Sequence, residues 1–136
     1  MLPDVNIWLA LAFESHKHHR DALVWFSGIG TSGVSFCRLT MLGFLRLVQN
    51  PSAFPGEAVS GAEAWTFYQA FRADERVTFQ DEPPGIEELL ATFFAKIQGP
   101  SPKQVTDAYL AAFSRLAGLP LHTFDNTLKT HPLLKP

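Results

Sequence analysis

The chain opens with Leu2-Pro3-Asp4-Val5-Asn6-Ile7-Trp8, a stretch that predicts a short strand ending near Asp4 and a helix soon after it. Apolar residues at Leu9, Leu11 and Phe13 continue the helical pattern. A strand that ends on an acidic residue and leads into a helix is therefore the first unit of the predicted fold.

The rest of the sequence continues the alternation of strands and helices. Further strands are expected at residues 34–37, 77–79 and 121–124. Helices are expected at residues 18–26, 39–48, 86–97 and 105–116, with another starting after Ser60, which together with Glu63 suggests a capping box. This order predicts a single three-layer α/β/α domain over residues 1–136, with a mostly parallel central sheet of four to five strands.

Composition places the chain among ordinary globular proteins. Hydrophobic residues make up 46% and charged residues 18% of its 136 residues, and twelve Phe and three Trp suggest an aromatic core. The single Cys37 excludes an intramolecular disulfide and fits a reducing compartment. The start does not read as a signal peptide, and no apolar run approaches the roughly 18 residues that a membrane span needs. A cytoplasmic location is the expectation.

The net charge of −2 restricts the way in which this chain could bind nucleic acid. A protein that holds nucleic acid by electrostatics alone is expected to be basic. If this chain handles RNA, a local feature must offset its negative charge, and a bound divalent cation would do so.

Three acidic residues lie where a site is expected. Asp4 and Asp125 each end a predicted strand, and Asp107 lies in the first turn of a predicted helix. Ligands of parallel sheets bind beyond the carboxyl ends of the strands, so these carboxylates are expected to converge there. Clustered carboxylates repel one another, whereas Mg²⁺ prefers such oxygen ligands and can activate water for phosphodiester cleavage.

Each of these acids also has a purely structural interpretation. Asp107 could favour the dipole of its helix, and Asp125 could cap a short segment at residues 126–129. Asp4 could start the first helix in the same way. The coincidence of all three at the carboxyl ends of the sheet favours a site.

Four motifs resemble those of one known family. Three of them resemble the opening, central and late motifs of PIN domains: Asp4-Val5-Asn6, the stretch from Thr106 to Ala112 (TDAYLAA) and Thr123-Phe124-Asp125. The stretch from Gly43 to Pro51 (GFLRLVQNP) is typical of one VapC-like branch, the toxin ribonucleases of type II (VapBC) toxin–antitoxin systems. The motifs come in the family's order and cover essentially the whole chain.

The resemblance implies an Mg²⁺- or Mn²⁺-dependent endoribonuclease that hydrolyses RNA with metal-activated water. Asp4, Asp107 and Asp125 would be its catalytic metal ligands, and Asn6 and Thr123 would be supporting polar residues. It also implies a homodimer and a small VapB-like antitoxin, which inhibits the toxin and binds operator DNA.

One departure from the family pattern concerns Arg38, which stands where most PIN domains carry Glu. Residues 22–56 contain no acid that could substitute, and a guanidinium cannot ligate a metal. The favoured outcome is one metal on three Asp with Arg38 contacting RNA phosphate. The alternative is an RNA- or antitoxin-binding module with weakened catalysis.

Two further sets of residues leave alternatives open. Arg38 and Arg46 would lie about 80° apart on one helix, and they form either an RNA-facing basic strip or, through Arg46, an ion pair with a site carboxylate. His16, His18 and His19 suggest zinc, but a solvated helix start is favoured, because adjacent helical positions do not face one point. A phosphatase with an aspartyl nucleophile is disfavoured, because Asn6 replaces its second Asp.

Overall fold

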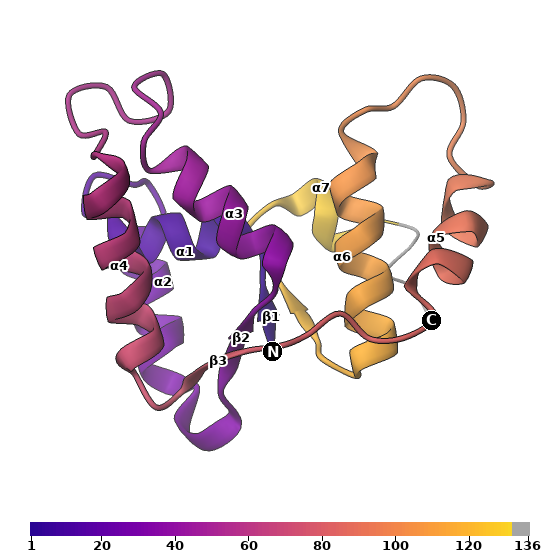
Figure 1. Ribbon diagram of the computed structural model, residues 1–136, viewed down its shortest axis with the longest axis horizontal. Helices are drawn as coiled ribbons and strands as arrows, with labels where there is room; N and C mark the ends of the chain where they lie inside the picture. Colours follow the sequence, from indigo (N-terminus) through magenta and orange to yellow (C-terminus); the bar gives the residue numbers. More distant parts are fainter. Residues whose placement is uncertain (132–136) are drawn as a thin grey trace.

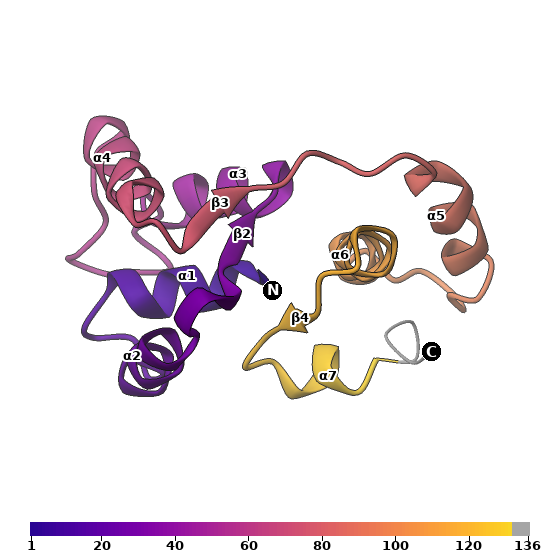
Figure 2. The ribbon, with the colours of Figure 1, turned by 90° about the horizontal axis from the view of Figure 1, so that it is seen from below.

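The computed structural model describes residues 1–131, apart from the side chain of Thr127. In chain order its elements are β1 (Leu2–Pro3), α1 (Val5–Ala12), α2 (His19–Gly28), a 3₁₀ turn (Gly30–Ser32), β2 (Val34–Phe36), α3 (Arg38–Leu47), α4 (Gly61–Ala73), β3 (Val77–Phe79), α5 (Ile86–Phe94), α6 (Gln104–Ala117), β4 (Leu121–His122) and α7 (Asn126–Lys129). The strands lie between one group of helices, α1–α4, and a second group, α5–α7 (Figures 1 and 2). The three-layer α/β/α architecture is therefore confirmed.

The number of strands agrees with the predicted four to five, but the strands that the structure describes do not form one continuous sheet. Within the described residues there are four, arranged as two parallel pairs, β1 with β4 and β2 with β3. A single backbone hydrogen bond, from Ser35 N to Met1 O at 2.9 Å, joins β2 to the residue before β1. All strand pairs are parallel, so their carboxyl ends meet at one edge, as the sequence predicts.

Two predicted elements end two or more residues earlier in the structure than the sequence suggests. The helix expected to reach Ile97 ends at Phe94, because Lys96 N and Ile97 N bond three residues back, as in a 3₁₀ turn. The strand expected to reach Phe124 ends at His122. There the backbone N–H of Asp125 bonds the hydroxyl of Thr123 instead of a neighbouring strand.

Aromatic side chains fill much of the core, as the composition predicts. Trp8 on α1 stacks on Phe36 of β2 with ring centroids 3.7 Å apart, and both side chains are fully buried. A second cluster, around Phe93 and Phe113, packs α5 against α6. The strands are held between these two clusters, which fixes the edge where Asp4 emerges.

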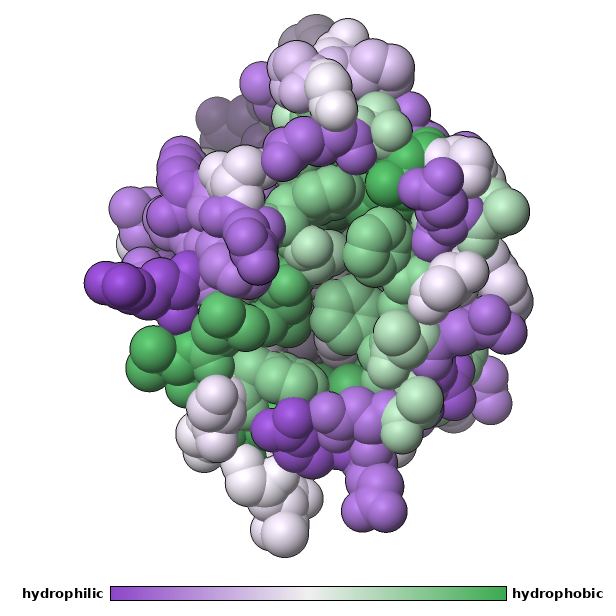
Figure 3. Space-filling view, turned by 90° about the vertical axis from the view of Figure 1, so that its left-hand side faces the viewer, coloured by the Kyte–Doolittle hydropathy of each residue, from purple (hydrophilic) through white to green (hydrophobic). Residues whose placement is uncertain are grey.

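One face of the molecule is hollowed and apolar. Figure 3 shows a hydrophobic depression ringed by hydrophilic residues on the side where α2 and α4 lie. Exposed Leu23 and Val24 of α2 and Trp65 of α4 are among the large apolar side chains that the protein leaves in contact with solvent. In the described part of the chain, no helix has the length and apolar character needed to cross a bilayer.

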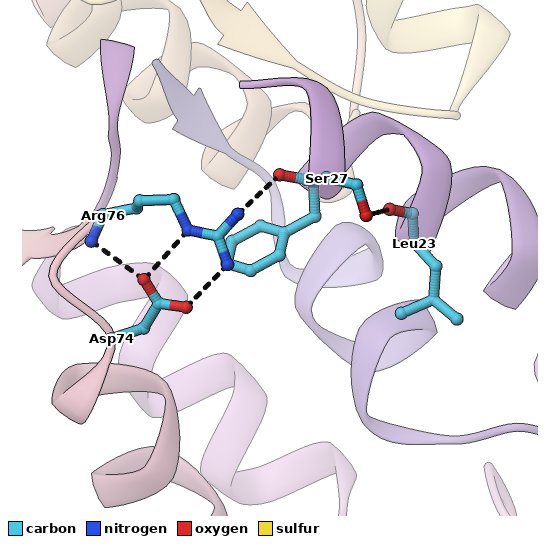
Figure 4. A network of polar contacts seen from close by, with 5 residues as sticks. Leu23, Ser27, Asp74 and Arg76 are labelled. Atoms are coloured by element: carbon cyan, nitrogen blue, oxygen red, sulfur yellow. Dashed lines mark hydrogen bonds and ion pairs between the residues drawn. The ribbon is translucent and has the colours of Figure 1, made fainter. Parts of the chain in front are cut away.

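Arg76 connects the start of β3 to the end of α2. Its guanidinium donates to both carboxylate oxygens of Asp74, at 3.0 and 2.7 Å, and to Phe26 O at 3.1 Å (Figure 4). It also lies over the Phe26 ring, 4.0 Å from the centroid. These bonds to Arg76 hold the pKa of Asp74 at about 2, below its ordinary 3.8.

The lowered pKa of Asp74 leads to a prediction about acid stability. Ionised Asp74 stabilises the folded state above its ordinary pKa of 3.8, and this stabilisation is lost as the pH falls from 3.8 towards 2. We expect Asp74→Asn to unfold at a lower temperature than the wild type near neutral pH, with the difference shrinking across that window. Thermal unfolding followed by circular dichroism measures it, with Asp81→Asn as the exposed-carboxylate control. A difference that is independent of pH would contradict the prediction.

Candidate active site

Asp4 is held at the carboxyl end of β1. Its backbone N–H donates to His122 O at 2.9 Å, which extends the pairing of β1 with β4. Its side chain is buried, 5% exposed, and one carboxylate oxygen accepts from Ile7 N at 3.2 Å, which caps α1. The prediction that Asp4 starts the first helix is therefore correct. Capping uses only one of the two carboxylate oxygens of Asp4.

Thr123 binds the other carboxylate oxygen of Asp4. Its hydroxyl donates a hydrogen bond to Asp4 Oδ2 and accepts from Asp125 N at 2.9 Å. The Thr123 side chain is itself buried. One hydroxyl thus holds both the Asp4 carboxylate and the backbone of Asp125. These two bonds are what Thr123 needs in order to orient the site carboxylates, as the sequence analysis expected.

Asp125 and Asp107 complete a group of carboxylates that repel one another. Asp125 accepts from Leu128 N at 3.4 Å, at the start of α7. Burial raises the pKa of Asp4, and repulsion from Asp125 adds to the shift, while the bond from Thr123 opposes it. Burial also raises the pKa of Asp107. The charge of His131 opposes this rise, and the charge of Asp125 adds to it. Perturbed carboxylates of this kind are typical of functional sites.

A single pocket of about 250 Å³ collects most of the predicted site residues. All three aspartates line it, together with Asn6 from the first turn of α1 and Arg46 from α3. The remaining lining residues are Val5, Leu39, Gly43, Leu47, Thr106, Leu110 and Leu128. Residues far apart in the sequence therefore meet at the predicted edge of the sheet, although their catalytic roles remain predictions.

The pocket has the right chemistry for a hard cation without forming a closed coordination shell. Within residues 1–131, no three carboxylate, imidazole or thiol side chains converge closely enough to make a ready metal site. The donors that surround the pocket are carboxylate oxygens, which Mg²⁺ and Mn²⁺ prefer, and Mg²⁺ usually keeps several waters. The chemical type of the donors around the pocket therefore fits Mg²⁺ or Mn²⁺.

The two arginines of α3 lie in different places, so they do not form one basic strip. Exposed Arg46 lines the acidic pocket and makes no ion pair within the described part of the chain. Arg38 lies over the Phe79 ring, 4.5 Å from its centroid, and lines a separate pocket with Glu82. Arg38 therefore does not occupy a position among the site carboxylates.

The structure adds residues that the sequence analysis did not connect with the site. At Gly43 an added Cβ would lie 2.8 Å from a Val5 methyl, so the glycine allows α3 to approach α1 beside the pocket. A glycine inside a predicted helix was the available signal. His131 lies close enough to Asp107 to affect its pKa, and His18 stacks on Phe124 next to Asp125.

A three-layer α/β/α domain with aspartates gathered at the carboxyl edge of its parallel strands is the arrangement of PIN domains. The PIN domain family model matches residues 1–132. The chain belongs to the PIN-domain family.

Curated relatives place the chain close to one group of this family. It is 42% identical to Ribonuclease VapC41 of Mycobacterium tuberculosis over 130 residues, which cover 92% of this chain and 88% of the relative. It is 36% identical to Ribonuclease VapC38 of the same organism over 91% of this chain and 84% of the relative. The crystal structure of Mycobacterium tuberculosis VapC20, described as a sarcin-ricin loop cleaving toxin, matches with a TM-score of 0.71 at 17% identity, covering 96% and 94%.

The bond from Thr123 to Asp4 predicts what its removal would do. In Thr123→Val the charged form of Asp4 loses a donor, so its pKa should rise further above the ordinary value. Stability should fall by about 1–3 kcal/mol, the cost of leaving a buried acceptor unpaired. Carboxyl-carbon NMR titration and denaturant unfolding measure the two effects in metal-free buffer. Thr123→Ser, which keeps the hydroxyl, should resemble the wild type, and an unchanged Asp4 pKa in Thr123→Val would contradict the prediction.

Proposed function

We propose that this chain is a cytoplasmic endoribonuclease, the toxin component of a VapBC-type toxin–antitoxin system. The observation that carries the proposal is the meeting of Asp4, Asp107 and Asp125 in one pocket at the carboxyl ends of parallel strands. The names of relatives up to 42% identical, all VapC ribonucleases, agree with it.

The proposed cofactor is Mg²⁺ or Mn²⁺, held by Asp4, Asp107 and Asp125. When bound, the ion supplies an activated water and neutralises charge on the phosphodiester. Raised pKa values of Asp4 and Asp107 mean that ionising these acids costs folding free energy, and a cation that binds the ionised forms would offset this cost. Mg²⁺ usually keeps several waters, so bound waters would complete the coordination beside these carboxylates.

The surrounding residues orient the reacting groups. Thr123 and the N–H of Ile7 hold both oxygens of Asp4 in one orientation, so this carboxylate needs no rearrangement when substrate arrives. Asn6 is exposed on the rim and offers an amide to RNA or water. Arg46 brings a positive charge to the same pocket, where it can contact a phosphate that the carboxylates would otherwise repel.

The proposed partners are a VapB-like antitoxin that inhibits the toxin and binds operator DNA, and a second copy of this chain. The apolar depression over α2 and α4 supports a protein partner, because exposed apolar patches rimmed by polar residues are typical of interaction surfaces (Figure 3). A pocket of about 370 Å³ on that side includes Phe67 and Ala70 of α4.

The alternative function, a binding module with weakened catalysis, rested on Arg38 replacing a site carboxylate. Arg38 lies outside the acidic pocket, against Phe79, and three aspartates still line that pocket. The alternative is not favoured, because the curated relatives that this chain matches are named ribonucleases.

Cleavage of RNA by the purified, antitoxin-free protein tests the proposal. We expect discrete fragments of total RNA with Mg²⁺ or Mn²⁺, none with EDTA, and a loss of at least a hundredfold in rate for Asp4→Asn, because that change removes a charged ligand. Asp81→Asn, an exposed carboxylate outside the acidic pocket, is the matched control and should cut like the wild type.

Titration of Mn²⁺ by calorimetry gives an independent readout of the same site. Asp4→Asn should weaken Mn²⁺ binding, whereas Asp81→Asn should not. A folded wild type that neither binds Mn²⁺ nor cuts RNA would overturn the proposed function, and cutting by Asp4→Asn at the wild-type rate would overturn the proposed site.

The different positions of the two arginines predict different effects on RNA. Arg46→Ala should weaken RNA binding and lower the cleavage rate roughly tenfold, because Arg46 lines the acidic pocket and is positively charged. Arg38→Ala should change both by less than about threefold, since Arg38 faces Phe79. Single-turnover cleavage and fluorescence anisotropy measure the effects. If Arg38→Ala lost more RNA affinity and cleavage rate than Arg46→Ala, the RNA would run along the pocket that Arg38 lines with Glu82.

A further inference from the structure

A second pocket adjoins the acidic one and has a different character. It has a volume of about 400 Å³, and its lining residues are Asn6, His16, Lys17, His18, Phe124 and Asp125. Asn6 and Asp125 line both pockets, so the two pockets lie side by side at the carboxyl edge of β1 and β4. A strand of RNA with one phosphate at the aspartates would therefore place a neighbouring nucleotide here.

Two rings that line this second pocket, His18 and Phe124, belong to a chain of stacked aromatic side chains. His18 stacks on Phe124 with centroids 4.8 Å apart and an interplanar angle of 28°. Phe124 meets His122 edge to face at 5.8 Å, and His122 stacks on Trp25 at 4.2 Å. The His18 side chain is 33% exposed, so a ring supported from behind is still open to solvent.

The loop that carries His18 is fixed by hydrogen bonds on both sides. His16 N bonds Phe13 O at 3.1 Å, and His16 Nδ1 accepts from His18 N at 3.1 Å. His19 Nδ1 lies 2.7 Å from Ala10 O, which ties the start of α2 to α1. A platform that is already ordered loses little entropy when a ligand stacks on it.

The charge of the second pocket also differs from that of the acidic pocket. Lys17 is exposed and forms no ion pair within the described residues. Lys17 lines the second pocket together with His18 and Phe124, so its side chain can reach a phosphate beside the stacked rings. Base stacking on aromatic faces combined with backbone contacts from basic residues is the usual way in which single-stranded nucleic acid is bound.

We propose that this second pocket is a nucleotide subsite, which holds the RNA residue adjacent to the bond that is cut. The nucleobase stacks on His18, which Phe124 supports, and Lys17 contacts a flanking phosphate. This proposal rests on the proposed ribonuclease function and adds how the substrate is held. It favours single-stranded or unpaired RNA, because a stacked base must leave its helix.

Two labelled RNAs test the contribution of stacking: hexaadenylate and the same ribose-phosphate chain without bases. Binding is measured by fluorescence anisotropy with EDTA present, so that the RNA stays intact. In the wild type, hexaadenylate should bind more tightly than the base-free chain. His18→Ala should weaken hexaadenylate binding roughly tenfold while leaving the base-free chain unaffected. His18→Phe keeps a ring and should bind hexaadenylate within about threefold of the wild type.

Lys17→Ala tests the phosphate contact. It should weaken the binding of both RNAs alike. It should also lower by about one the slope of the logarithm of the binding constant against the logarithm of the salt concentration. Lys96→Ala, an exposed lysine after α5 and away from the second pocket, is the matched control and should bind like the wild type. Thermal unfolding of every variant establishes that it is folded.

The outcomes separate this proposal from the function on which it rests. If the wild type cuts RNA but His18→Ala does not change hexaadenylate binding, or if the wild type shows no preference for bases, the subsite is overturned and the ribonuclease stands. If the wild type neither cuts RNA with Mg²⁺ or Mn²⁺ nor binds hexaadenylate, both are overturned.

Discussion

The pairing of β1 with β4 is the constraint on which the rest of this structure depends. It is a short parallel pair, Leu2 with Leu121 and Pro3 with His122, flanked by backbone bonds from Leu2 N to Pro120 O and from Asp4 N to His122 O and by the bond from Thr123 to Asp4. The last of these joins residues 119 positions apart. The entropy of closing so long a loop grows only slowly with its length, so a buried bond and two packed cores can offset it. Without this pairing, Asp4 and Asp125 would not share a pocket.

The same side chains serve the fold and the candidate site. Asp4 caps α1 through one oxygen and accepts from Thr123 through the other, while Asp125 begins α7. Helix capping and metal ligation are therefore not competing explanations, because the start of each helix is also what aims its carboxylate. The raised pKa values of Asp4 and Asp107 record the energetic cost of this arrangement. A protein selected for stability alone would gain by removing one of these charges.

Helix α3 illustrates how a sequence argument about spacing can fail. Arg38 and Arg46 are eight residues apart, which suggested one side of a helix. The structure gives them different neighbours, because Arg38 begins the helix and turns to Phe79, whereas Arg46 lies near its end beside the aspartates. The histidines before α2 show the converse. Their spacing suggested zinc or, more favourably, a solvated helix start, yet the segment after β4 brings Phe124 against His18.

The sequence by itself determined the order of strands and helices and the three-layer class, because apolar periodicity, capping residues and turns are local signals. It also identified Asp4, Asp107 and Asp125 as the acids that end strands or begin a helix. Only the tertiary structure decided that the four strands form two short pairs, that Arg46 and not Arg38 lines the acidic pocket, and that a ring platform adjoins it. These features depend on contacts between residues far apart in the chain, and such contacts are set by packing, which leaves no periodic pattern in the sequence.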